Sequence, residues 1–302
     1  MGDPKYSLIN LGDLSKPANT LIKKISAAIG GLYKPFQIRR VAQAEADADK
    51  IQAAAQIEIT KLQHRAISRL FAEEAKKQHN IEAITLKALA DVGPEAKTDD
   101  VEDDWIANFF DKCRLISDEE MQSLWARILA GEANSPGKFS KRTVNLVGSL
   151  DKSDAMLFSR LCGFGFTIAQ NFDPLIFNTD HKIYSDAGIH FGGISHLEST
   201  GLIQFSVADY YRTGISQKGF VYYFGHPVWI EFPQGQKKHQ LPIGQVLLTK
   251  AGAELAPLSG AQPREGFVDF VKNQWKRFGI KTEQQTVQST TGEAESGSPP
   301  AG

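Results

Sequence analysis

The fold of this chain is decided by residues 37–91, which read QIRRVAQAEADADKIQAAAQIEITKLQHRAISRLFAEEAKKQHNIEAITLKALAD. The stretch holds no proline and no glycine and therefore predicts one long helix, roughly 80 Å from end to end. From Ala48 onward its apolar positions follow each other in steps of three, four and four, an eleven-residue repeat. A helix of this length cannot bury an apolar stripe by itself, so it needs a partner.

The partner of the long helix is predicted to be another copy of the chain. Because many positions of the stripe are alanine, two helix backbones could approach closely. An intramolecular hairpin with the helices of residues 98–162 is the alternative. The predicted oligomerisation residues are Val41, Ala48, Ile51, Ala55, Ile59, Leu62, Ala66 and Leu70.

Composition limits the class of protein. A length of 302 residues suggests about two domains, and the hydrophobic content of 41% suffices for a core. The net charge of -1 excludes a globally basic nucleic-acid binder. Charge is nevertheless segregated, since residues 1–40 hold seven Lys or Arg against two Asp. A basic end of this kind suits an anionic lipid surface or a nucleic acid.

The two cysteines, Cys113 and Cys162, each stand in an apolar stretch and are predicted to be buried, reduced thiols. Reduced thiols favour a cytosolic location. The sequence shows no signal peptide and no run of about 18 apolar residues that could cross a bilayer. The predicted location is therefore cytoplasmic, with contact to the inner membrane surface as an option.

Residues 1–36 form a basic amphipathic segment, and Ser15-Lys16-Pro17 predicts a helix start. The helix over 17–34 has the pattern of one that lies in the headgroup plane of a membrane. Packing of its apolar face on the long helix or on a partner chain is the alternative. The predicted membrane-contact residues are Leu21, Ile22, Lys23, Lys24, Ile25, Ile29, Leu32 and Tyr33.

The remainder of the chain divides into three parts. Residues 98–162 predict a bundle of four helices, with Ser117 to Glu120 as the capping box of the second. Residues 163–280 change to short strands rich in Phe, Tyr, Val and Ile, mixed with helices. Residues 281–302 are poor in apolar side chains and are predicted to be a disordered tail. The fold class is α+β, mainly α.

The order of elements over 185–258 is similar to a winged helix. A helix over 185–199 ends in HLESTGLI, a hairpin follows, and LTKAGAEL opens another helix. The alternative function is therefore a nucleic-acid-binding regulator, with contacts from Lys182, Arg212, Lys218, Lys237 and Lys238. Residues 185–199 contain no Arg, Lys, Asn or Gln to reach base edges. Nucleic acid is thus an unfavoured partner, and protein contact or a structural role is preferred for this unit.

The sequence predicts no catalytic residues, no metal site and no cofactor. It has no G-x-S-x-G elbow, no phosphate-binding glycine loop and no H-E-x-x-H motif. His190 and His196 are six residues apart and do not share a helical face, so hydrogen-bonded histidines are expected instead of ligands.

Several stretches resemble a poorly characterised bacterial family related to the abortive-infection alpha (Abi-alpha) proteins. They are SLWARILAGE at 123–132, PGKFSKRT at 136–143, the Asp151 to Phe158 segment, GLYKPFQIRR at 31–40 and LPIGQVLLTKAGAEL at 241–255. The resemblance implies a bacterial cytosolic protein with a role in phage defence by growth arrest or cell death. It brings no catalytic residues with it.

The leading interpretation is a non-enzymatic defence effector or adaptor that self-associates through 37–91 and uses 17–34 at the inner membrane. A scaffold for an enzyme encoded nearby is a further alternative that the sequence does not separate from the first.

Overall fold

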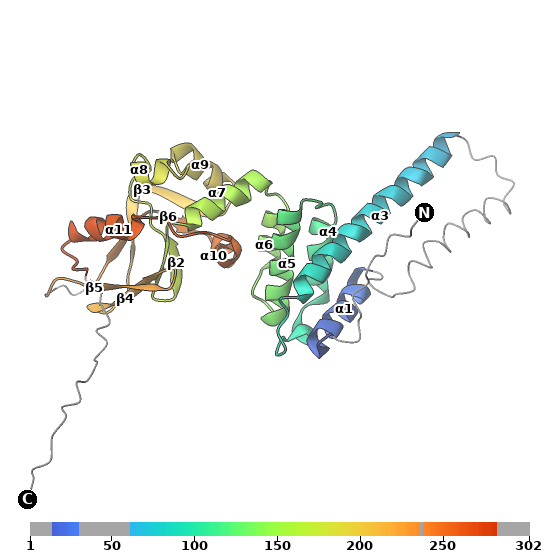
Figure 1. Ribbon diagram of the computed structural model, residues 1–302, viewed down its shortest axis with the longest axis horizontal. Helices are drawn as coiled ribbons and strands as arrows, with labels where there is room; N and C mark the ends of the chain where they lie inside the picture. Colours follow the sequence, from blue (N-terminus) through green and yellow to red (C-terminus); the bar gives the residue numbers. More distant parts are fainter. Residues whose placement is uncertain (1–13, 30–60, 236–237, 283–302) are drawn as a thin grey trace, which may run out of the picture.

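The computed structural model describes residues 14–29, 61–235 and 238–282. The protein is α+β and mainly helical, which confirms the predicted class. Figure 1 shows two lobes joined near α6, α7 and α10, and one long helix that extends from the first lobe. Residues 30–60, which carry the first half of the predicted long helix, lie outside the described residues.

The first lobe is helical. Ser15 caps its first helix, as predicted, by accepting a hydrogen bond from the amide of Ala18. In this lobe α1 packs on α4, the C-terminal half of α3 packs on α5, and α4 packs on α6. The elements are α1 (Lys16–Ile29), α3 (Lys61–Leu89), the 3-10 turn η2 (Thr98–Asp100), α4 (Asp103–Cys113), α5 (Glu119–Asn134) and α6 (Lys141–Val147).

Aromatic rings fill the centre of this lobe. Trp105 stacks on Phe109, and Trp125 meets Phe109 edge to face, with centroids 5.1 Å apart in both pairs. All three side chains are buried. The predicted capping box of α5 is wrong, because Asp118 and not Ser117 accepts the amides of Glu120 and Met121. The short Asp side chain reaches both orphan N–H groups of the first turn.

The second lobe mixes helices and sheet. Its helices are α7 (Lys152–Cys162), α8 (Lys182–Ser185), α9 (Phe191–Ser199), α10 (Lys250–Leu255), the 3-10 turn η3 (Ala256–Leu258) and α11 (Phe267–Lys276). Its strands are β1 (Gly165–Ile168), β2 (Asn171–Pro174), β3 (Ile203–Arg212), β4 (Lys218–Tyr223), β5 (His226–Glu231) and β6 (Leu241–Leu248). They form one antiparallel sheet in the order β2-β1-β4-β5 and one pair β3-β6.

Helix α7 belongs with the second lobe. It packs on α9, where His196 Nε2 lies 2.7 Å from Asp154 Oδ1. The predicted bundle over 98–162 includes this helix, because hydrophobic periodicity locates a helix but does not reveal its partner.

The predicted helix over 185–199 is interrupted. Gly188 has a φ of +73°, and His190 then caps α9 by accepting the amide of Gly193 through Nδ1. After α9, strand β3 pairs with β6. The predicted hairpin is formed by β4 and β5, which lie between β3 and β6 in the sequence. This hairpin joins β1 and β2 and does not form the tip of a two-stranded wing. The winged-helix assignment therefore stays a prediction.

The core of the second lobe lies between the four-stranded sheet and α11. Phe166 of β1 meets Trp275 edge to face, and Tyr223 of β4 meets Phe267. The buried carboxylate of Asp173 in β2 forms two hydrogen bonds with the guanidinium of Arg212 in β3. This ion pair ties the two sheets together across the lobe.

Both cysteines are free and buried, as predicted. Burial raises the pKa of Cys162 to about 12, with a small opposing effect of a hydrogen bond from Ser259. Burial also raises the pKa of Cys113 far above its usual range. Neither group is a thiolate at neutral pH, so both act as small core side chains.

We expect Gly244→Ala to destabilise the second lobe strongly. Gly244 has a φ of +88°, and a Cβ there would lie 2.2 Å from the carbonyl oxygen of Ile176. To relieve this clash, the chain must break the 2.7 Å hydrogen bond that the amide of Gln245 donates to the same oxygen. We expect a loss of more than about 2 kcal/mol in the free energy of unfolding, measured by urea titration.

Gly219→Ala is the matched control, because Gly219 also lies in a strand but has open space around its missing Cβ. If Gly244→Ala lowers the free energy of unfolding no more than Gly219→Ala does, the close approach of Gly244 to the Ile176 carbonyl is contradicted.

Candidate functional site

The lobes meet at the turn and first residues of α6, between 135 and 143. Two groups of the first lobe hold this segment. The buried carboxylate of Glu132 accepts the amide of Gly137 at 2.6 Å and that of Phe139 at 2.9 Å. The indole of Trp105 donates to the carbonyl oxygen of Phe139 at 2.7 Å. The segment is thereby fixed to α4 and α5.

A carboxylate of the second lobe holds the same segment from the other side. Glu254 of α10 accepts the amide of Ser140 at 3.1 Å and the hydroxyl of Thr143 at 2.5 Å. Ser140 is the N-cap of α6 and accepts the amide of Thr143. The negative charge of Glu254 therefore stands at the positive end of α6. Thr249 in turn caps α10 by accepting the amide of Gly252.

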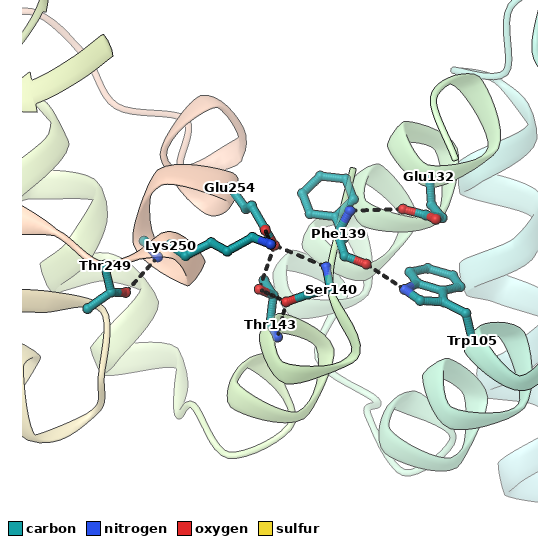
Figure 2. Close-up of polar contacts among 9 residues, drawn as sticks. Trp105, Glu132, Phe139, Ser140, Thr143, Thr249, Lys250 and Glu254 are labelled. Carbon is teal, nitrogen blue, oxygen red and sulfur yellow. Dashed lines mark hydrogen bonds and ion pairs between the residues drawn. The ribbon is translucent and has the colours of Figure 1, made fainter. Parts of the chain in front are cut away.

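Figure 2 shows Glu254 pointing to Ser140 and Thr143 from α10, while Glu132 and Trp105 hold Phe139 from the opposite side. We refer to Trp105, Glu132, Ser140, Thr143 and Glu254 as the inter-lobe latch. Its carboxylates are occupied by backbone and hydroxyl donors, so they position a segment and do not offer a free acid or base.

The inter-lobe latch gives a structural role to residues in three of the stretches that carry the sequence resemblance. Gly131 lacks a Cβ that would lie 2.7 Å from the ring of Phe139. The LAGE end of 123–132 thus supplies the space and the acceptor for the segment 136–143. The TKAGAEL stretch supplies Glu254. Sequence reasoning located these stretches but missed their joint role, because 111 residues separate Glu254 from Thr143.

A cavity of about 330 Å³ lies beside this contact, between α5, α7 and the α10–η3 segment. Its lining is mainly apolar, with arginines among the side chains. Lining residues include Met121, Leu124, Arg127, Met156, Arg160 and Leu258. The lobes are therefore in contact at the latch and separated by a hollow next to it.

The predicted oligomerisation stripe is partly described. Every residue of α3 from Lys61 to Lys76 is exposed, whereas Ile81, Ile84 and Ala88 are buried against the first lobe. Leu62 is 68% exposed and Leu70 is 56% exposed, and Ala66 between them is exposed as well. Val41, Ala48, Ile51, Ala55 and Ile59 lie outside the described residues.

The apolar face of α1 is packed inside the protein. Leu21 and Ile25 are fully buried and Ile22 is 8% exposed. Lys24 donates to the carbonyl oxygens of Asp99 and Val101. These residues cannot contact a membrane in this arrangement, and the packing alternative describes them better, although the partner is α4 and not the long helix.

The other residues of that prediction have different positions. Lys23 is exposed and Ile29 is half-buried. Leu32 and Tyr33 lie outside the part of the chain that the structure describes. No helix within the described residues is both long and apolar enough to cross a membrane.

The candidate nucleic-acid residues are not brought together as one surface. Arg212 is paired with buried Asp173, which raises the pKa of its guanidinium and removes it from phosphate contact. Lys182 lies on exposed α8, and Lys218 begins β4. Lys238 is exposed, and Lys237 lies outside the described residues. None of them lies on α9.

The histidines have structural roles. His181 and His190 cap α8 and α9, and His196 pairs with Asp154. Burial is the largest effect on Asp154 and raises its pKa, but the hydrogen bonds from His196 and the amide of Asp151, together with the charge of His196, outweigh it and lower the pKa. In the described ranges, no group of three His, Cys, Asp or Glu side chains has the geometry to hold a metal ion.

These observations define a two-lobed α+β protein whose lobes are joined by the hydrogen bonds of the inter-lobe latch. The chain belongs to the family described as "Protein of unknown function (DUF2806)", which matches residues 64–272. No curated protein and no solved structure matches the chain. The family includes both halves of the latch and most of α3, whereas α1 lies before the matched residues.

We expect Glu254→Ala to loosen the latch. Loss of two hydrogen bonds to a carboxylate should lower the free energy of unfolding by about 1–3 kcal/mol. Hydrogen exchange of residues 138–147 should become faster, while exchange in α3 and α5 stays the same. Lys250→Ala is the control, since Lys250 is 82% exposed and lies 3.8 Å from Glu254, and it should cost under about 0.5 kcal/mol. Equal effects of both substitutions would contradict the latch.

We expect the stability of the protein to depend on pH through Glu132. Burial raises the pKa of Glu132 above its ordinary value. The hydrogen bonds from the amides of Phe139 and Gly137 lower the pKa in part, and the charge of Glu254 raises it further. Between the ordinary pKa and the raised one, the folded chain holds more protons than the unfolded chain. Stability therefore falls as pH rises through that window and levels off above it.

Glu132→Gln removes this titration. The stability advantage of the natural protein over the variant should shrink as pH rises from about 4 to the raised pKa, measured by urea titration at each pH. A difference that stays constant with pH would show that Glu132 does not titrate in this way.

Proposed function

We propose that this protein is a non-enzymatic effector or adaptor that self-associates through α3. The observation that carries the proposal is the exposed half of α3, from Lys61 to Lys76. It bears four large apolar side chains that are 37% to 68% exposed, namely Leu62, Ile67, Leu70 and Phe71. A helical segment of about 16 residues is marginal in water by itself, so a partner would stabilise it.

The positions of these side chains suit a helical partner. Leu62, Ala66 and Leu70 are spaced by four residues and form one stripe, and Ile67 and Phe71 form a second stripe beside it. Basic residues occur at 61, 65, 69 and 76 and acidic ones at 73 and 74, and Arg69 pairs with Glu73 within the helix. Antiparallel pairing of two copies would place the basic residues at 65 and 69 of one copy near the acidic ones at 73 and 74 of the other, which supports a second copy as the partner.

The role in phage defence rests on the resemblance to the Abi-alpha-related proteins, and the DUF2806 family adds no activity to it. In this proposal the latch keeps the two lobes in a fixed relation while α3 assembles the copies. Contact of α1 with the inner membrane would require release of Leu21 and Ile25 from the first lobe. A cytoplasmic location, with or without membrane contact, remains part of the prediction.

The winged-helix assignment enters as a proposal about the second lobe. The chain order α9, β3, β4, β5, β6, α10 supports it, and the absence of Lys and Arg from α9 favours a protein-contact or structural unit.

We expect the double substitution Leu62→Glu and Leu70→Glu to abolish self-association. Two buried charges at a helix–helix contact cost far more than the pairing returns. Light scattering over a range of concentrations should show the natural protein above its chain mass of 33.2 kDa and the variant at that mass. Circular dichroism checks that both are folded.

Ser68→Glu with Ala72→Glu is the matched control, because it adds the same charge on the side of the exposed half of α3 that lies away from both stripes. It should leave the mass unchanged. A natural protein that stays monomeric at tens of micromolar, or a control that dissociates equally, would refute assembly through this stripe.

A further inference from the structure

The four-stranded sheet of the second lobe has two different faces. Its inner face, with Phe166, Val221 and Tyr223, is buried against α11. Along β4 the burial alternates, so that Phe220 and Tyr222 point away from this core. Figure 1 shows α11 on one side of β4 and β5.

The outer face is aromatic. Phe220 lies opposite Trp229 in the ladder, and Tyr222 lies opposite Pro227. Phe220 is 38% exposed and Tyr222 is 45% exposed. The rings of Phe220 and Trp229 meet edge to face with centroids 5.1 Å apart. We refer to Phe220, Tyr222 and Trp229 as the aromatic platform.

The composition of the platform is unusual for a solvated sheet face. An antiparallel strand with one face in the core normally places polar side chains on the other. Here the inner face already supplies the core, so three large outward aromatics are not needed to bury the sheet. Aromatic rings exposed together on a rigid sheet are suited to stacking against flat ligand groups.

Cationic side chains stand at one end of the platform. Lys218 lies opposite Glu231, and Glu231 pairs on its other side with Lys281. Lys218 and Lys281 are exposed. Two lysines against one carboxylate give this end of the row a net positive charge.

We propose that the aromatic platform binds single-stranded nucleic acid, with bases stacked on Phe220, Tyr222 and Trp229 and phosphates near Lys218 and Lys281. Stacking on aromatic side chains beside a cationic track is how proteins hold single strands without reading their sequence. Bases inside a duplex do not offer their faces to such a sheet. The cations favour a polyanion over a neutral sugar or a proline-rich peptide.

This site is different from the winged-helix alternative, in which α9 would enter a groove of a duplex. It is also separate from the self-association proposed for α3, because the platform lies in the other lobe. The Leu62→Glu and Leu70→Glu variant should therefore retain binding of single strands, so that failure of one proposal does not carry over to the other.

Trp229 provides a direct probe of the platform. The chain has four tryptophans, and Trp105, Trp125 and Trp275 are buried, whereas Trp229 is partly exposed. Stacking of a base should quench the fluorescence of Trp229. Trp229→Phe should remove most of this quenching and still permit binding, detected by fluorescence anisotropy of a labelled oligonucleotide.

The experiment uses the full-length protein with oligonucleotides of about 12 units, a length within the range that single-strand sites cover. Single-stranded DNA, single-stranded RNA and duplex DNA of the same sequence are compared at low and physiological salt. We expect both single strands to bind and the duplex to bind more weakly. Trp229→Ala and Tyr222→Ala should each weaken binding roughly tenfold.

Two control substitutions remove an exposed aromatic ring or reverse a lysine charge outside the platform. Phe191→Ala removes an aromatic that is 60% exposed on α9 and should not alter binding. Lys218→Glu should weaken binding and flatten its salt dependence, whereas Lys182→Glu on α8 should do neither.

The proposal is overturned if no single strand binds at low salt, if the duplex binds equally well, or if Phe191→Ala acts like Trp229→Ala. It is also overturned if a neutral oligosaccharide quenches Trp229 while oligonucleotides do not. Loss of self-association in the platform variants without loss of oligonucleotide binding would identify the face as a contact between copies.

Discussion

The segment between α5 and α6 is held by carboxylates from both lobes, and much of the arrangement depends on this constraint. Glu132 accepts two backbone amides from one side, and Glu254 accepts an amide and a hydroxyl from the other. Glu132 is buried, and a buried carboxylate is costly unless donors surround it, so the segment must keep its amides on Glu132. The lobes are thus joined by a contact that tolerates little displacement of the segment.

This constraint gives the protein a rigid centre with different ends. On one side, the N-terminal half of α3, before Lys77, extends out of the first lobe. The packed C-terminal half of the helix fixes the direction of this exposed half. On the other side, α11 and the pair of Asp173 with Arg212 fix the sheet. Both lobes are thereby tied to one shared segment, as the proposed adaptor role would require.

The sequence predicted the helices well and their partners poorly. Periodicity located α1, α4, α5 and α7, because an apolar stripe at helical spacing is a local property. It could not show that α7 packs on α9 or that Glu254 accepts hydrogen bonds from Ser140 and Thr143 at the start of α6, since those contacts join residues far apart in the chain. The cap of α5 was misplaced by one residue, because Ser117 and Asp118 are both good N-caps and only geometry separates them.

The candidate surfaces show the same division between local and long-range information. Leu62 and Leu70 were predicted to be exposed to a partner, and their exposure follows from a helix that continues beyond its lobe. Leu21 and Ile25 have an equally amphipathic pattern, yet α4 covers them. An amphipathic pattern predicts that one face of a helix is buried, but it does not identify the element that buries it. The platform was missed for a related reason. Phe220, Tyr222 and Trp229 look like core residues in the sequence, and only the position of α11 on one face reveals that they stand on the other.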